Sequence, residues 1–215
     1  MKPELMDTTW YKELEPLFLN GTMTTIRKSL NNICPESPKN IFRAFLMPLQ
    51  EVKICILGLS PYPNKNDAKG IAFAVEEDRD YNYWPYSLKI INDAIANDYA
   101  DISIMLRPDL SNWTNQGVLL LNSALTCEVG QPLSHVDIWK PFTQKVIEIL
   151  DQNRIIFYLL GSEAKSYKSI IKYSKVFESI HPAACAYNNV KFDSKFKEVV
   201  DYYYNINKDS IVLTQ

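Results

Sequence analysis

The feature that most constrains this chain is an apolar run that ends in a turn-rich loop, within residues 52–75. Residues 52–57 are almost entirely apolar, which is typical of a central parallel strand that helices cover on both faces. Gly58 follows this run, and the loop after it holds the proline, asparagine and glycine residues that favour tight turns. Because ligands of α/β proteins bind at the carboxyl ends of strands, we expect the functional site in this loop.

Two further apolar runs, at residues 118–121 and 155–160, predict the next strands of the same sheet, and the segment 175–179 predicts a shorter fourth strand. Strands that alternate with helices form parallel βαβ units with right-handed crossovers. The predicted fold class is therefore α/β, with three α/β/α layers around a central four-stranded parallel sheet. In such a sheet the loops that follow the strands lie along one edge.

Helices are predicted from apolar residues at spacings of three and four. Two such patterns within residues 8–48 predict a helical cover at one end of the sheet. Residues 142–150 and 193–204 show the same periodicity. Ser87 is the expected N-cap of another helix, because a serine hydroxyl can accept a hydrogen bond from a free N–H of the first turn.

The composition is that of a globular chain, with 215 residues, 47% of them hydrophobic and 22% charged. This length suits a single domain over residues 1–215. No apolar run approaches the ~20 residues of a membrane helix, and the acidic N-terminus lacks the apolar core of a signal peptide. Four scattered cysteines without CxxC spacing favour a reduced, cytoplasmic location over zinc binding. The net charge of −2 gives no general signal of nucleic-acid binding.

Side chains at the predicted edge of the sheet could together bind a flat, polar heterocycle. The amide of Asn122 has both a donor and an acceptor, which suits a base edge that presents an oxygen beside an N–H. Phe73 could stack on a ring, and Tyr62, between two prolines, could form a rigid wall. His181 could donate to an oxygen that gains negative charge. These features fit a pocket for a base flipped out of a nucleic acid.

Each of these residues also has an ordinary structural interpretation. Asn122 could bond to loop backbone at the end of its strand, and His181 could be a hydrogen-bonded structural histidine. Phe73 lies within the apolar run IAFAV and could belong to the core. Ser162 after Gly161 could simply begin a helix, or hold a phosphate there. Only the convergence of these residues on one edge favours the functional interpretation.

Several long motifs, in order along the chain, resemble those of the family-1 uracil-DNA glycosylases. The sequence GLSPYPNKNDAKGIAFAV (58–75) is similar to the family's G-Q-D-P-Y-H-G-x-x-x-A-x-G-L-x-F-S-V. PDLSNWTNQGVLLLNSALTCEVGQPLSH (108–135) and IFYLLGSEA (156–164) match further segments. His181-Pro182 matches the start of the family's H-P-S-P-L loop. The resemblance covers nearly the whole chain and implies a four-stranded parallel sheet flanked by helices.

The resemblance implies a role for each base-directed residue. Phe73 would stack on a flipped uracil, and Asn122 would bond its O4 and N3 edge. Tyr62 would exclude the methyl group of thymine. His181 would stabilise charge on O2 as the N-glycosidic bond breaks. Leu59 stands at the position of a family glutamine and is assigned to the uracil-binding set.

Contacts with the DNA strand are implied in the same way. Ser87, in the motif WPYSL, and Ser162 would contact phosphates. Pro182 and Ala183 belong to the loop that meets the DNA, and here the phosphate-binding serine of the family is Ala183. Cys185 aligns with the leucine that fills the vacated base stack, and this smaller side chain predicts weaker insertion. Tyr187 is a second candidate for that role.

The most consequential departure is Ser60, which stands where the family has its catalytic aspartate. A serine hydroxyl can position water, but it has no charge to stabilise a cationic sugar. Asp67 is close in sequence and could partly substitute, or could simply be a solvated carboxylate.

The favoured hypothesis is a uracil-DNA glycosylase of base excision repair with reduced or altered catalysis. It would need no metal or cofactor. Its partner would be uracil-containing DNA, single- or double-stranded, without a membrane, and the protein is expected to be a monomer. The alternative is a non-catalytic uracil- or DNA-binding protein on a glycosylase scaffold. Altered base specificity is less favoured, because the base-reading residues are retained.

Overall fold

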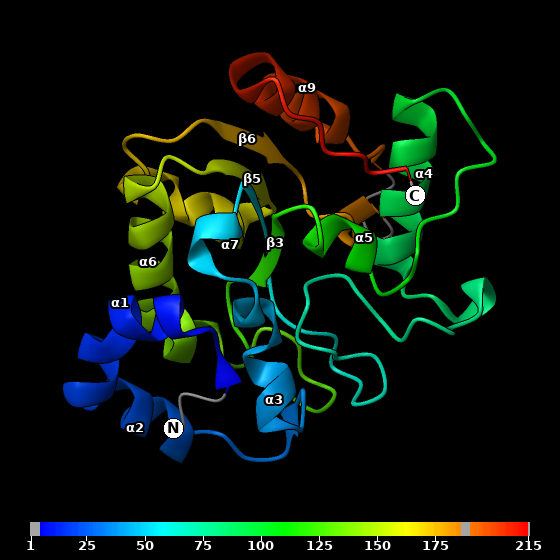
Figure 1. The fold of residues 1–215 in the computed structure, drawn as a ribbon. Coiled ribbons are helices and arrows are strands. Elements are labelled where there is room, and N and C mark those ends of the chain that lie inside the picture. Colours follow the sequence, from blue (N-terminus) through cyan, green and yellow to red (C-terminus); the bar gives the residue numbers. More distant parts are fainter. Residues whose placement is uncertain (1–4, 186–189, 215) are drawn as a thin grey trace.

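The computed structural model describes residues 5–185 and 190–214, and Figure 1 shows their course. Tyr187 lies outside the described residues. The longer helices are α1 (Thr8–Leu19), α2 (Thr22–Lys28), α4 (Tyr86–Asp98), α6 (Val136–Gln152) and α9 (Phe196–Asn207). The short helices are α3 (Pro38–Ile41), η2 (Arg43–Leu46), η3 (Leu49–Glu51), η4 (Tyr81–Tyr83), α5 (Ser111–Thr114), α7 (Ser162–Ser166) and η5 (Tyr167–Ile170). None of the described helices is long and apolar enough to cross a membrane.

The central sheet has four parallel strands in the order β3-β2-β5-β6. They are β2 (Ile54–Gly58), β3 (Val118–Asn122), β5 (Ile156–Leu160) and β6 (Val176–Ser179). This confirms the predicted four-stranded parallel sheet, with strand ends shifted by one or two residues. The register aligns the last residues of neighbouring strands, because Gly58 pairs with Asn122 and Leu160 pairs with Ser179. The loops that follow the strands therefore meet along one edge.

Residues of the central strands alternate between two hydrophobic cores, as the period of two in a strand requires. In β2, Cys55 and Leu57 belong to one core, whereas Ile54 and Ile56 belong to the other. All five residues of the strand are buried. Both faces of the sheet are therefore covered, which explains why the strands read as continuous apolar runs in the sequence.

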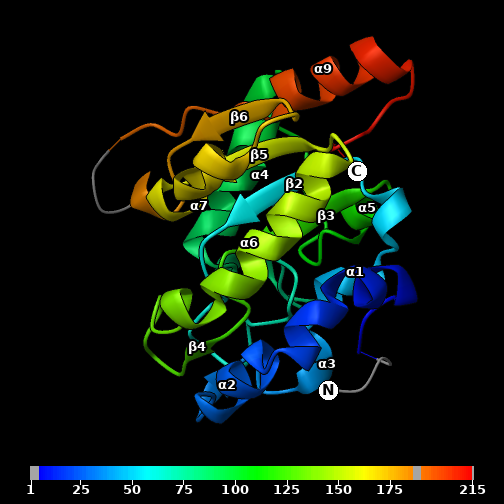
Figure 2. The same cartoon turned by 90° about the vertical axis from the view of Figure 1, so that its left-hand side faces the viewer.

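Helices form one layer on each face of the sheet, as Figure 2 shows. The first core holds residues of α1, α2 and α6, including Trp10 and Phe142, together with Phe42 at the end of α3. The second core holds residues of α4, α5 and α9, including Trp113 and Phe196. The predicted three-layer α/β/α arrangement is thus confirmed.

The C-terminal segment after α9 packs across α5, and the space-filling view shows it against that part of the surface. The indole nitrogen of Trp113 donates to the carbonyl of Leu213 at 3.0 Å. Gln116 exchanges two hydrogen bonds with the backbone of Val212. This segment therefore closes the second core at the end of the sheet opposite the site.

A second, two-stranded sheet was not predicted. Its strands are β1 (Ile33–Cys34) and β4 (Cys127–Glu128), which pair in antiparallel fashion. The thiol of Cys127 lies 3.5 Å from the carbonyl oxygen of Pro61, within the loop after β2. The backbone N–H of Gly130 donates to the carbonyl of Pro63 at 2.8 Å. These contacts fix the loop after β2 against the two-stranded sheet. Strands of two residues are too short to leave a periodic signal in a sequence.

One local expectation was wrong. Ser87 does not cap α4, because the helix begins at Tyr86 with Pro85 at the N-cap position. The apolar run at residues 71–75, for which no regular element was predicted, forms turns and irregular backbone. Here the carbonyl of Leu120 accepts a hydrogen bond from Ala72, so the run packs along the edge strand β3.

The approach to β6 is held by one buried carboxylate, Asp151, near the end of α6. It accepts hydrogen bonds from the backbone N–H groups of Lys172, Tyr173 and Ser174 at 2.8–2.9 Å. Burial by itself raises the pKa of a carboxyl, but these donors outweigh it and hold the pKa of Asp151 below its usual value. The carboxylate thus fixes the turn from which β6 runs towards His181.

We expect Asp151→Asn to lower the free energy of unfolding at pH 7 by about 2 kcal/mol, because it weakens hydrogen bonds to a charged acceptor. A lowered pKa gives stability that is present at neutral pH and lost as the carboxyl protonates. The difference from wild type should therefore shrink below pH 3.8, the ordinary value for Asp. Denaturant unfolding at several pH values measures it. The exposed Asp78→Asn is the control, and an equal loss at all pH values would contradict the interpretation.

Candidate nucleobase pocket

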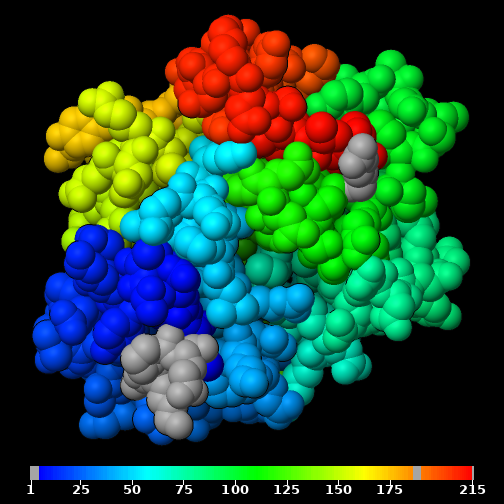
Figure 3. All heavy atoms as spheres, viewed as in Figure 1, coloured from blue at the N-terminus to red at the C-terminus, as the bar shows by residue number. Residues whose placement is uncertain are grey.

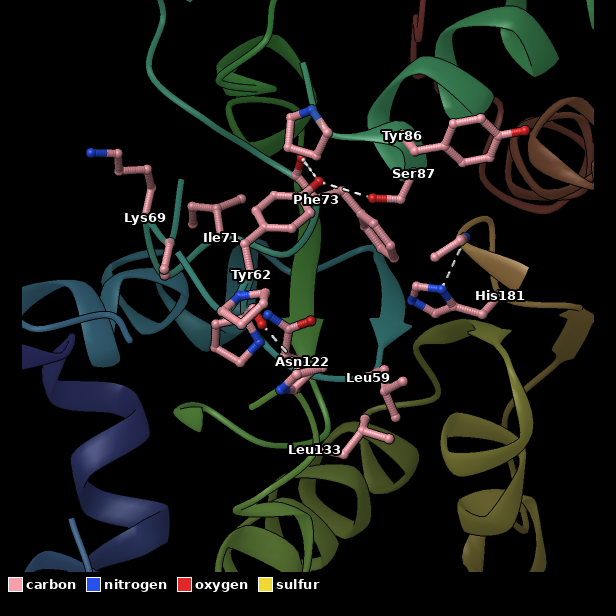
Figure 4. Close-up of a pocket in the computed structure, with 18 residues that line it drawn as sticks. Leu59, Tyr62, Lys69, Ile71, Phe73, Tyr86, Ser87, Asn122, Leu133 and His181 are labelled. Carbon is pink, nitrogen blue, oxygen red and sulfur yellow. Dashed lines mark hydrogen bonds between the residues drawn. The ribbon is translucent and has the colours of Figure 1, made fainter. Parts of the chain in front are cut away.

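A pocket of about 370 Å³ opens at the carboxyl ends of β2 and β3. Figure 4 shows the side chains that line it. Eight of the residues predicted from the sequence meet here: Leu59, Ser60, Tyr62, Phe73, Ser87, Asn122, His181 and Ala183. They come from four separate segments of the chain, which the parallel register brings to one edge of the sheet.

Gly58 makes room for the two groups at the floor of the pocket. A Cβ atom on this residue would lie 2.9 Å from Cζ of Phe73 and 3.0 Å from Oδ1 of Asn122. The missing side chain therefore lets an aromatic ring and an amide approach the same point. Asn122 is only 8% exposed, and its amide has no hydrogen-bond partner among the described residues. A polar group in this position is ready to bind a ligand.

Phe73 is held in an uncommon backbone conformation, with φ at 68°. Left-handed backbone is unfavourable for a bulky residue and is often retained at functional sites. Its ring lies 5.7 Å from that of His181, measured between centroids, at an angle of 38°. The two rings form adjacent walls of the pocket, although Phe73 is itself mostly buried.

Tyr62 is locked in place by its hydroxyl group. The hydroxyl donates to the carbonyl oxygen of Phe73 at 2.8 Å and lies 3.0 Å from Oγ of Ser87. Burial raises the pKa of Tyr62, so the phenol is neutral. Ser87 is buried, and its hydroxyl is turned towards Tyr62. Tyr62 therefore forms a rigid wall, and Ser87 supports that wall.

His181 is a neutral hydrogen-bond donor that faces the pocket (Figure 4). Burial lowers the pKa of His181 to about 4, because the charged ring loses hydration. Nδ1 lies 3.2 Å from the backbone nitrogen of Ala183, and a backbone N–H can only donate. The ring proton is therefore assigned to Nε2. Gly161 allows this placement, since a Cβ there would lie 2.9 Å from Cβ of His181.

The pocket has no carboxylate among the described residues that line it. Ser60 lies on its wall, and its hydroxyl donates only a weak hydrogen bond, at 3.4 Å, to the carbonyl of Pro61. Asp67 does not line the pocket and forms an ion pair with Arg79. It therefore does not replace the missing acid, and because its side chain is only 17% exposed it is an ion-paired carboxylate instead of a freely solvated one.

Three predicted residues lie outside the pocket lining. Ser162 is exposed at the start of α7, and Pro182 is buried. Cys185 is 6% exposed and packs in the second core. A side chain that enters a base stack must reach out of the protein surface, and the structure instead holds Cys185 beneath it.

The sequence analysis missed Lys69, Ile71, Tyr86, Pro132 and Leu133, which also line the pocket. Leu133 and Tyr86 are about half exposed, at 47% and 48%. Their positions depend on how the β4 segment and the start of α4 fold over the edge of the sheet. The available signal was that Tyr86 stands directly before Ser87, a residue already assigned to the site.

The chemistry of the pocket suits a flat heteroaromatic ring. The Phe73 ring offers a stacking face, Tyr62 closes one edge, and Asn122 offers a donor and an acceptor. His181 lines the same pocket and carries an N–H donor on Nε2.

Residues 46–203 match the family model described as the Uracil DNA glycosylase superfamily. The chain is 40% identical over 182 residues to the uracil-DNA glycosylase of Borrelia turicatae (strain 91E135), covering 81% of this chain and 80% of that one. It is 34% identical over 221 residues to that of Borrelia duttonii (strain Ly), covering 96% and 97%. The crystal structure of mimivirus uracil-DNA glycosylase has the same fold, with a TM-score of 0.83 at 20% identity over 97% of this chain and 87% of that one.

We expect His181 to titrate near pH 4 and to carry its neutral proton on Nε2. Long-range ¹H–¹⁵N NMR spectra recorded across pH would show both properties. The chain has two histidines, so the signals that vanish in His181→Gln are those of His181. A titration near the ordinary value of 6.5, or a proton on Nδ1, would show that the assigned geometry is wrong.

Proposed function

The chain belongs to the uracil-DNA glycosylase superfamily, and we propose that it is a uracil-DNA glycosylase of base excision repair. Its substrate is uracil-containing DNA. The reaction breaks the bond between C1′ of the sugar and N1 of uracil, and water supplies a hydroxyl group to C1′. One observation carries this proposal: the four base-directed residues Tyr62, Phe73, Asn122 and His181 converge in a single pocket.

Base recognition uses the three groups at the floor and wall of the pocket. The uracil ring stacks on Phe73, and the amide of Asn122 donates to O4 and accepts from N3–H. Tyr62 lies where a methyl group on C5 would stand, so thymine is excluded by steric conflict. The two hydrogen bonds of the Tyr62 hydroxyl keep this wall from moving aside. Leu59 contributes apolar contact where the pocket opens.

Bond cleavage depends on stabilising the departing uracil anion. As C1′–N1 lengthens, its electron pair moves into the base and negative charge develops on O2. The Nε2–H of neutral His181 donates to that oxygen, and burial makes the interaction stronger than it is in water. Because the pKa of His181 is about 4, the ring needs no deprotonation step at neutral pH.

Ser60 accounts for the reduced or altered catalysis that we propose. Its hydroxyl can accept a hydrogen bond from the attacking water and orient it towards C1′. It offers no negative charge to the cationic sugar, and Asp67 is committed to Arg79. The negative charge that stabilises the cationic sugar therefore comes from the departing uracil anion and the DNA phosphates.

The remaining predicted residues are assigned to the DNA strand. Ser162 is exposed and is assigned to a phosphate contact, and the backbone around Pro182 and Ala183, next to His181, is assigned to the strand. Ser87 acts through Tyr62, because its side chain is buried against that hydroxyl. We propose that residues 1–215 act as one monomeric domain in the cytoplasm, in keeping with four unpaired, buried thiols.

The direct test is an oligonucleotide that contains one uracil, incubated with the pure protein and then treated with alkali. Strand scission at the uracil, and none with thymine in its place, is expected. Uracil-dependent binding without scission, at stoichiometric protein, would instead support the non-catalytic alternative.

Asn122→Asp should lower kcat/KM for uracil about 100- to 1,000-fold, because a carboxylate cannot donate to O4 and repels it. Asn31→Asp, an exposed site with the same change of charge, serves as the matched control. If Asn122→Asp retains wild-type activity, the assigned base pocket is wrong.

Ser60→Asp should raise the cleavage rate at saturating protein by about 10-fold or more, because it restores a negative charge near the sugar cation. Ser60→Asn adds similar volume without charge and should not accelerate the reaction. Single-turnover rates measure both variants. An unchanged rate for Ser60→Asp would place Ser60 away from the attacking water.

A further inference from the structure

Tyr86 stands at the mouth of the base pocket with an unpaired aromatic face. It is the first residue of α4, directly before Ser87, and its side chain is 48% exposed. Among the described rings, it stacks on no other, whereas Tyr81 in the same segment packs on Trp84 at 5.1 Å between centroids. Tyr81 therefore packs against another aromatic ring of the protein, whereas one face of the Tyr86 ring remains available to a ligand.

The ring of Tyr86 separates the base pocket from a second hollow of about 420 Å³. That hollow lies between α4 and residues 190–192, and it is lined by apolar side chains that include Ile90 and Phe192. Figure 4 shows Tyr86 beside Ser87, with its hydroxyl directed away from Phe73. A nucleotide next to one held in the pocket would meet this ring first.

The groups around the mouth favour a base over a phosphate as the occupant. Lys69 is the one charged side chain among the described residues of the pocket, and it is already paired with Glu76. In the second hollow Lys191 is accompanied by Asp93. Little positive charge is therefore available to hold a phosphate there, whereas an exposed aromatic face suits the π-face of any base.

We propose that Tyr86 is a base-stacking residue, whose ring packs against the nucleobase adjacent to the extruded uracil. This inference rests on the proposed function. Stacking on an aromatic side chain depends little on which base is present, so the neighbouring nucleotide adds affinity without restricting sequence context. Because the contact is made before and during the reaction alike, it acts on binding more than on the chemical step.

The test compares wild type, Tyr86→Ala and Tyr86→Phe on a short single strand with one uracil, under single-turnover conditions. Tyr86→Ala should raise the half-saturating protein concentration about 5- to 150-fold, as expected for one lost stacking contact. The maximal rate should change little, and Tyr86→Phe should resemble wild type. Tyr204→Ala is the matched control, because Tyr204 is 51% exposed on α9 and lines neither hollow.

A second arm replaces the nucleotide directly 5′ or 3′ of the uracil with an abasic analogue. On one of the two sides, the abasic analogue should weaken binding by the wild-type protein about as much as Tyr86→Ala weakens binding to the intact strand. On that side the analogue should cause no further loss of binding by Tyr86→Ala. On duplex DNA, Tyr86→Ala should raise the half-saturating protein concentration by a smaller factor, because the neighbouring base is already stacked and paired there.

Several results would overturn the inference. The first is a half-saturating concentration for Tyr86→Ala within about twofold of wild type. The second is an increase in this concentration for Tyr86→Phe as large as that for Tyr86→Ala. The third is that Tyr86→Ala and the abasic analogue weaken binding additively on both sides of the uracil. Failure of the proposed function looks different, because wild type itself would then leave the uracil strand intact. In that case fluorescence anisotropy with the same strands still measures the contribution of Tyr86 to binding.

Discussion

The parallel register of β2 and β3, which sets Gly58 beside Asn122, is the constraint on which the site depends. A side chain at Gly58 would collide with both the Phe73 ring and the Asn122 amide. Its absence lets a stacking surface and a hydrogen-bonding edge share one floor. The second short sheet then holds the loop after β2, through the contact of Cys127 with Pro61. Base recognition is therefore a consequence of backbone packing as much as of the side chains that touch the base.

Burial makes the pocket chemically useful. His181 is neutral because the surrounding protein removes the hydration that a charged ring needs, and the backbone N–H of Ala183 selects the tautomer. A neutral, buried donor can stabilise a developing anion without giving up its proton. The described lining of the pocket offers no carboxylate for a cationic group, and Ser60 stands where the resemblance implies one.

The groups assigned to base recognition are thus more fully retained in this chain than those assigned to catalysis and to filling the strand. The base-reading wall of Tyr62 and Ser87 is fully assembled, with both hydrogen bonds of the phenol in place. The water-activating position and the strand-filling position hold small, uncharged side chains, Ser60 and Cys185. The proposed role of the exposed Tyr86 ring is to supply contact area where those positions do not. Under that proposal, specificity comes from the pocket and part of the affinity from stacking.

The sequence by itself determined the sheet and predicted the edge on which the candidate site lies, because continuous apolar runs and turn residues are local signals. The side chains assigned to base recognition were predicted from their positions after these runs, and the structure brings them into one pocket. The motif resemblance added their roles. Only the tertiary structure decided that Ser87 supports Tyr62 instead of capping α4, that Cys185 is buried, and that Asp67 is bound to Arg79. These outcomes depend on contacts between segments that are distant in sequence, and so does the open face of Tyr86. Local pattern predicts which residues reach the site, whereas packing decides which of their atoms remain free to act.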